Sequence, residues 1–163
     1  MRLLNRTALV GMVLLGCVGC DQISKSTARQ YLPGTGIHSF LGDTFRLQYA
    51  QNPGVFLSLG DSLPAAIRYG AFTIAVGALV VAGLAWAVLS GRLTGLQRVA
   101  IAAIGAGGLS NVIDRIRFDG AVTDFLNLGI GSLRTGIFNV ADAILMAGVA
   151  ALLITYGHED RNR

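Results

Sequence analysis

Long apolar runs separated by short polar connections dominate the pattern of residues along the chain. The clearest run, from Ala71 to Leu89, contains no charged side chain. Four runs can be drawn, each near the roughly 20 residues that a helix needs to cross the hydrocarbon core of a bilayer. Their ranges are about 7–24, 66–89, 96–113 and 137–156. We therefore expect one integral membrane domain over residues 1–163, an all-α bundle of four transmembrane helices with a small β addition.

The β addition is expected in two segments that lie between the runs. In residues 37–59, polar and apolar side chains alternate from Thr44 to Tyr49, a turn follows at 52–54, and a second strand is expected from Val55 to Leu57. Residues 114–136 form the other segment, an outer loop between the third and fourth runs. Together they predict a hairpin or small sheet, a β-rich cradle lying on the outer surface of the membrane.

Composition agrees with a membrane protein and excludes several other classes. The chain is 53% hydrophobic and 13% charged, whereas a soluble domain has about 25% charged residues. This excludes a disordered chain, a disulfide-rich secreted domain and an ordinary cytosolic enzyme. The net charge of +4 does not indicate nucleic-acid binding, because no cluster of four or more Lys and Arg residues is present.

The charged residues also bear on orientation. Four crossings place both termini on one side, and Arg2 and Arg6 before the first run favour the cytoplasm for that side. The full count of Lys and Arg, six on this side and seven on the other, does not decide the matter. Seven of the nine acids fall on the far side or at its membrane boundary: Asp21, Asp43, Asp61, Asp114, Asp119, Asp124 and Asp142. We expect the chemistry at that outer face.

The N-terminal region offers two misleading patterns. Leu14-Leu15-Gly16-Cys17 resembles the lipobox of a bacterial lipoprotein, but the apolar run continues past Cys17 and three more runs follow. Cys17 and Cys20 form a C-x-x-C pattern inside an apolar helix, where we expect both to be passive packing residues. His38 and His158 are isolated, so the sequence supports no metal site.

Small residues are concentrated in the third run, which allows neighbouring helices to approach closely. They are Ala102, Ala103, Gly105, Ala106, Gly107 and Gly108. We expect these residues to serve helix packing first.

Ionisable residues in or beside a membrane span are costly and therefore mark candidate functional positions. Asp21 and Lys25 share one helical face, either as an ion pair that anchors the helix end or as a site that positions a substrate. Asn139 and Asp142 begin the fourth run, where Asn139 has the position of a helix cap. A capping role accounts less well for Asp142, because the apolar residues before it would hold its carboxylate at the membrane edge.

Asp124 is a second carboxylate in apolar surroundings, between Thr123 and Phe125. Two close carboxylates share one proton, because both cannot ionise together. The ionised one can then activate water while the protonated one donates to a carbonyl oxygen. The spacing permits an aspartyl hydrolase but does not establish it.

Five short motifs occur in order along nearly the whole chain. They are Asp21-Gln22-Ile23-Ser24-Lys25, Asn52-Pro53-Gly54-Val55-Phe56, Gly107-Gly108-Leu109-Ser110-Asn111-Val112-Ile113-Asp114-Arg115, Ala121-Val122-Thr123-Asp124-Phe125 and Phe138-Asn139-Val140-Ala141-Asp142. In these motifs the chain resembles the lipoprotein signal peptidases, the signal peptidase II family. Each motif is weak alone, and five in the right order are specific. Ser110 stands where glycine is usual, and Thr123 where valine is common.

The resemblance implies a role for each matching position. Asp124 and Asp142 would be the catalytic aspartates. Asp114 would be either structural or catalytic. The remaining positions would bind the substrate main chain or support the aspartates: Asp21, Lys25, Asn52, Gly54, Gly108, Asn111, Arg115, Asn139 and Ala141.

The resemblance also implies the reaction. An intramembrane aspartyl endopeptidase would remove the signal peptide from a prolipoprotein just before a diacylglyceryl-modified cysteine, in the bacterial cytoplasmic (inner) membrane. Its partners would be this substrate and membrane lipid, it would act as a monomer, and no cofactor or metal is expected. Two alternatives remain, a polytopic transporter or channel and a lipoprotein that is itself processed at Cys17.

Overall fold

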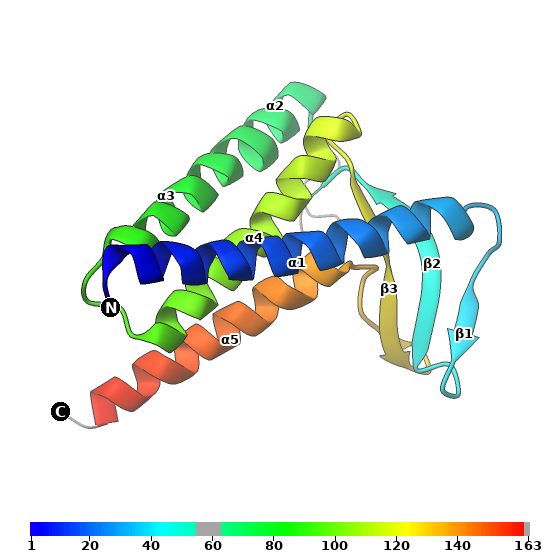
Figure 1. Ribbon diagram of the computed structural model, residues 1–163. Coiled ribbons are helices and arrows are strands. Elements are labelled where there is room, and N and C mark those ends of the chain that lie inside the picture. The colour runs from blue at the N-terminus through cyan, green and yellow to red at the C-terminus, as the bar shows by residue number, and fades with distance from the viewer. Residues whose placement is uncertain (55–62, 162–163) are drawn as a thin grey trace.

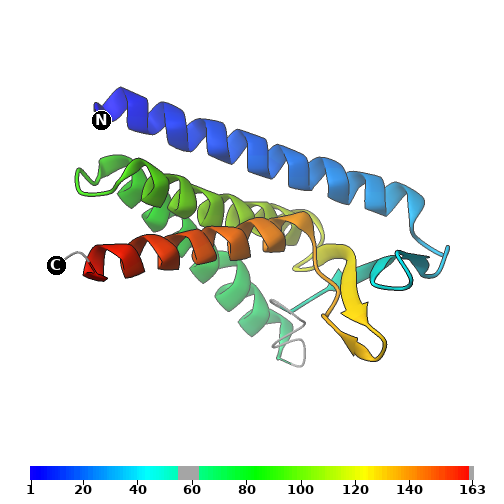
Figure 2. The same ribbon diagram turned by 90° about the horizontal axis from the view of Figure 1, so that it is seen from below.

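The computed structural model describes residues 1–54 and 63–161, and its helices run from one end of the molecule to a small sheet at the other (Figure 1). The helices are α1 (Leu3–Tyr31), α2 (Ala65–Tyr69), the π-helix η2 (Gly70–Ala75), α3 (Val76–Leu89), α4 (Gly95–Arg117) and α5 (Val140–Arg161). Both termini and the α3–α4 turn lie at the end opposite the sheet, as Figure 2 also shows. The termini therefore share one end of the bundle.

Three helical stretches in the described parts of the chain are long and apolar enough to cross a membrane. They are Leu3–Tyr31, Ala66–Leu89 and Gly95–Arg117. The second combines α2, η2 and α3 and agrees with the predicted run. The apolar part of α5, Val140–Thr155, is shorter than the predicted run of 137–156. It begins later because Phe138 forms a β-bridge with Leu126, which keeps the preceding residues extended.

The first and third runs continue as helix beyond their predicted ends. The prediction ended α1 at residue 24, but the helix ends at Tyr31, just before Pro33. A proline terminates a helix, whereas the polar residues before it do not. α4 likewise continues to Arg117. At its start, Thr94 and Gln97 form a reciprocal capping box, in which each side chain accepts the backbone N–H of the other residue.

α4 is the central helix of the bundle. In its most apolar stretch 67% of the residues are buried, compared with 6% in α1. A Cβ on Gly107 would lie 2.5 Å from the carbonyl oxygen of Ala141, so α4 and α5 pack almost backbone to backbone. The predicted packing role of the small residues is therefore confirmed.

The four strands within the described residues form one antiparallel sheet in the order β1-β2-β3-β4. Their bounds are His38–Phe40, Phe45–Asn52, Val122–Ile130 and Leu133–Arg134. The two predicted β-rich segments therefore join in one sheet, because β2 pairs with β3. The strand expected from Val55 to Leu57 lies outside the described residues.

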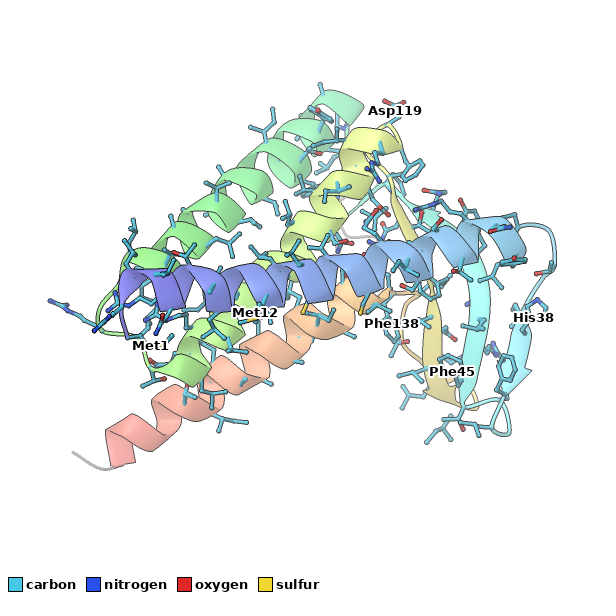
Figure 3. The ribbon with its side chains drawn as sticks, in the orientation of Figure 1. Met1, Met12, His38, Phe45, Asp119 and Phe138 are labelled. Carbon is cyan, nitrogen blue, oxygen red and sulfur yellow. The ribbon has the colours of Figure 1, made fainter. Side chains whose placement is uncertain are left out.

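The structure also shows where the two cysteines of α1 and the histidine of β1 lie. Cys17 is half-buried, but Cys20 is exposed, so the packing role predicted for Cys20 is wrong. α1 has few buried residues, Val10, Asp21, Lys25 and Ala28, and Cys20 is not on their face. His38 lies on the outer strand β1, away from the helices (Figure 3), where its Nε2 is 2.8 Å from Thr35 Oγ1.

Candidate active site

Asp124 and Asp142 lie where the sheet joins the helices, and Asn139 connects them. Asn139 Nδ2 donates a hydrogen bond of 2.7 Å to Asp124 Oδ1, while its backbone N–H donates to Asp142 Oδ2 at 3.2 Å. Asp142 N donates in return to Asn139 Oδ1 at 2.9 Å. Asn139 is therefore the helix cap that the sequence suggests. One residue caps α5 and also bonds both carboxylates.

A second amide completes the surroundings of each carboxylate. Asn52, at the end of β2, donates to Asp124 Oδ2 at 2.9 Å. Asn111, on α4, donates to Asp142 Oδ1 at 2.9 Å. All four carboxylate oxygens therefore accept an N–H, which fixes their orientation in a site where Asp124 is only 2% exposed.

Lys25 lies behind the Asn111 amide in a fully buried cluster of charges. Its Nζ is 2.7 Å from Asp21 Oδ2, 2.7 Å from Asn111 Oδ1 and 3.5 Å from Asp114 Oδ2. Lys25, Asp21 and Asp114 are each 0% exposed. Asp21 and Lys25 are thus not an ion pair at the membrane surface, because the continuation of α1 places them against α4.

Asp21 joins three helices through its two oxygens. Oδ1 accepts the backbone N–H of Ala141 on α5 at 2.7 Å, and Oδ2 accepts the hydroxyl of Ser110 on α4 at 2.7 Å. The serine found where glycine is usual in the family pattern therefore has a partner. Ala141 contributes its backbone, and its side chain is 0% exposed.

The described contacts of Asp114 hold parts of the fold together and do not include Asp124 or Asp142. Its Oδ1 accepts from Gln22 Nε2 at 2.9 Å, and its Oδ2 accepts the backbone N–H of Thr123 at 3.1 Å. It ties β3 to the helices, which is one of the two roles left open by the sequence. Its described ion pairs are with Lys25 and Arg29.

Arg115 connects α4 to the turn after β2. Its Nη2 donates to the carbonyl oxygen of Gly54 at 2.7 Å, and Gly54 N donates to Asn52 Oδ1 at 3.0 Å. Within the described residues, the buried Arg115 Nε has no hydrogen-bond partner. This N–H is available to an acceptor that is not part of the described protein.

The site opens into a cavity of about 380 Å³ lined by Asn111, Arg115 and Asp142 and by apolar side chains of α3 and α5. A second cavity, of about 220 Å³ and almost entirely apolar, lies between α3 and α4. Both are lined by Val76, Gly108 and Leu145. A Cβ on Gly108 would lie 2.7 Å from Val80 Cγ2, so a larger residue would alter the junction between them.

Burial is the largest of the influences that raise the pKa of Asp124 to about 6. The nearby Asp142 acts in the same direction, while the hydrogen bonds from Asn52 and Asn139 oppose it. A protonated Asp124 beside an ionised Asp142 is the arrangement that acid–base hydrolysis requires. Within the described residues, no group of three or more His, Cys, Asp and Glu side chains has the arrangement of a metal site.

Comparison with known families agrees with these motifs. The sequence model of the family described as signal peptidase (SPase) II matches residues 13–157. This chain belongs to the signal peptidase II family. Membership makes it a peptidase, and the three candidate spans make it a multi-pass bacterial membrane protein.

The similarity to members of the signal peptidase II family extends over nearly complete chains. The lipoprotein signal peptidase of Streptococcus pneumoniae is 31% identical over 160 residues, which cover 98% of this chain and 99% of the relative. That of Borrelia hermsii is 29% identical over 158 residues, 93% of this chain and 92% of the relative.

Two solved structures share the fold. Each is a bacterial membrane enzyme determined by the in meso method. One matches with a TM-score of 0.81 and 23% identity over 94% of this chain and 90% of its own. The other has a TM-score of 0.75 and 22% identity, over 90% and 91% of the two chains.

The motifs did not predict a role for three residues of the site region, although each of them bonds a residue of the motifs. Gln22 and Ser110 are joined at 3.0 Å beside Asp21 and Asp114. Arg29 bonds Thr123 Oγ1 at 3.0 Å. Helical spacing could have found Arg29, because it stands four residues after Lys25 on the same face of α1.

Proposed function

We propose that this chain is an intramembrane aspartyl endopeptidase that cleaves prolipoproteins immediately before a diacylglyceryl-modified cysteine. The family supports a signal peptidase, and one geometric observation supports the aspartyl mechanism. Asn139 bonds Asp124 with its side chain and Asp142 with its backbone, at 2.7 and 3.2 Å. Two carboxylates so linked, one protonated and one ionised, can activate water and protonate a carbonyl together.

In the proposed reaction, ionised Asp142 removes a proton from a water molecule, whose oxygen attacks the scissile carbonyl carbon. Protonated Asp124 donates its proton to the carbonyl oxygen, which gives a tetrahedral diol. Asp142 then passes its proton to the nitrogen of the modified cysteine, the C–N bond breaks, and Asp124 recovers its proton as the carboxyl product forms. Arg115 Nε, which has no hydrogen-bond partner in the described parts of the chain, would bond a carbonyl oxygen of the bound signal peptide.

The substrate has an apolar signal helix and acyl chains, so its site must adjoin lipid. The apolar cavity between α3 and α4 supports this, because it shares the lining residues Val76, Gly108 and Leu145 with the cavity that Asp142 lines. We further propose that α5 makes a fourth crossing, that both termini are cytoplasmic and that the site lies near the outer face. The single domain would act as a monomer.

Neither alternative function has comparable support. The described buried charges near the site gather where the helices meet the sheet, whereas a transporter is expected to have its site near the bilayer midplane. Processing of this chain at Cys17 would remove Val10 from the core between α1, α3 and α4.

The reaction can be tested with the purified chain and a synthetic peptide that carries a diacylglyceryl-modified cysteine after a signal sequence. We expect mass spectrometry to find one cut, on the N-terminal side of that cysteine. Solvent labelled with ¹⁸O should place the label in the new carboxyl group of the signal peptide. A matched peptide with unmodified cysteine is expected to be cleaved much more slowly. Cleavage elsewhere, or equal cleavage of both peptides, would contradict the proposal.

The raised pKa of Asp124 predicts a pH dependence. A carboxyl group that acts as an acid must be protonated, so kcat/KM should fall as the pH rises through about 6. Two pH units above this value, kcat/KM should be about 100-fold below its maximum. The measurement is a pH profile at substrate concentrations far below KM, with folding checked at each pH. Equal rates at the two ends of this range would show that Asp124 is not the acid.

A further inference from the structure

Thr123, the residue immediately before Asp124 on β3, is hydrogen-bonded to both α1 and α4. It is 0% exposed, although it carries a hydroxyl group where valine is common in the family pattern. The hydroxyl accepts hydrogen bonds from Arg29 Nη1 at 3.0 Å and from Gln51 Nε2 at 3.4 Å. Its backbone N–H donates to Asp114 Oδ2 at 3.1 Å. Both polar groups of Thr123 that face the helices are therefore occupied.

Arg29 connects Thr123 to both helices that border the sheet. It lies in the last turns of α1, and its Nη1 is 3.6 Å from Asp114 Oδ2 on α4. Its guanidinium carbon lies 4.5 Å from the ring centroid of Phe118, where α4 ends. The arginine thus contacts α1, α4 and β3 with a side chain that is 21% exposed. A planar guanidinium held at several points restricts the group that it bonds.

The hydrogen bonds of Asp124 itself do not reach α1. Its direct partners are Asn52 on β2 and Asn139 at the start of α5, so neither ties it to α1. The pairing of β2 with β3 is irregular between Leu47 and Ala50, just before the Ala50–Asp124 pair. The contacts of Thr123 attach β3 to the helices at the residue next to Asp124. An error of about 1 Å in the placement of a catalytic group can reduce a rate 100-fold.

We propose that Arg29 and the hydroxyl of Thr123 form a positioning pair that holds β3 on the helix bundle and so orients Asp124 toward Asp142. The pair does not contact substrate and acts through Asp124. This inference rests on the proposed function, since it assumes that Asp124 takes part in hydrolysis. It concerns two residues that lie outside the roles implied by the family motifs.

The test compares Thr123→Val, Arg29→Met and the double variant, each as the full chain with the diacylglyceryl peptide. Valine has the shape of threonine without its hydroxyl, and methionine retains part of the apolar stem of arginine. Each single change should lower kcat about tenfold, with KM within about twofold. Because one interaction is lost in each case, the double variant should also be about tenfold slower, rather than 100-fold. Thr123→Ser, which retains the hydroxyl, should restore kcat.

Controls separate this role from a general effect on the fold. Thr27→Val removes an exposed hydroxyl from α1, and Arg117→Met removes an exposed cation at the same end of the bundle. Both should keep the unaltered kcat. Normal kcat in the two single variants, a 100-fold loss in the double variant, or a serine variant as slow as the valine variant would overturn the proposal. Asp124→Asn is assayed in parallel, and activity in that variant would instead overturn the proposed function.

Discussion

Asp124→Asn and Asp142→Asn should each lower the rate of cleavage by about 10⁴-fold while the protein still folds and inserts. An amide has nearly the shape of a carboxyl group, but asparagine neither removes a proton from water nor donates one as an acid. In the proposed mechanism the two residues act in one proton cycle. We therefore expect the double variant to be little slower than either single variant. Single-turnover cleavage of the diacylglyceryl peptide measures the effect.

The design must separate lost chemistry from disturbed packing. In Asp124→Asn, one side-chain NH₂ group faces a former donor, Asn52 or Asn139, so one hydrogen bond of about 1 kcal/mol is lost. Thermal unfolding in detergent should detect only this small change. Asp119→Asn is the matched control, because Asp119 is exposed and has a positive φ of 52° that asparagine tolerates. A folded Asp124 or Asp142 variant with normal cleavage would remove the aspartyl mechanism.

The largest expected effect on stability comes from Lys25→Met. Methionine leaves Asp21 and Asp114, both 0% exposed, without the ammonium group that lies 2.7 and 3.5 Å from their oxygens. Removing one partner from a buried ion pair costs about 3–5 kcal/mol. Since Lys25 also bonds Asn111, the variant should lose activity with its stability. Equilibrium unfolding in mixed micelles measures the change.

A second substitution shows whether the uncompensated charge is responsible. Adding Asp21→Asn to Lys25→Met removes one buried negative charge, so the double variant should be more stable than Lys25→Met alone. Arg92→Met serves as the control, because it removes a cation from the exposed α3–α4 turn. We expect it to change the free energy of unfolding by less than about 0.5 kcal/mol. If Lys25→Met behaves like this control, the buried cluster does not stabilise the fold.

The sequence predicted the helices well because crossing a bilayer requires long apolar runs, which are visible without tertiary information. The predicted helix ends were less accurate where the residues at the end contact another element of the fold instead of water. Polar residues after residue 24 predicted the end of α1, yet Lys25 and Ala28 are buried against other elements. Residues 137–139 predicted the start of a helix, but Phe138 pairs with Leu126 instead.

The candidate site was predictable only as a set of residues. Order along the chain identified Asp124, Asp142 and the asparagines, because five short motifs occurred in sequence. It could not show that Asn139 bonds both aspartates or that Asp114 holds the backbone of Thr123. It also left Asp21 and Lys25 undecided between an anchoring pair and a substrate site. Those features depend on side chains from different elements, and local spacing carries no information about such contacts.

The buried Asp21–Lys25 pair has a consequence for how this chain is inserted as the ribosome synthesises it. Asp21 and Lys25 enter the bilayer before α4 and α5 exist, but each carries its counter-ion on its own helix, four residues away. That pairing lowers the cost of inserting two charges into lipid. Ser110 and Asp114 arrive with α4, and Asp142 arrives only with α5. Under the proposed mechanism, a nascent chain therefore lacks its second catalytic aspartate, and with it protease activity, until α5 has been synthesised.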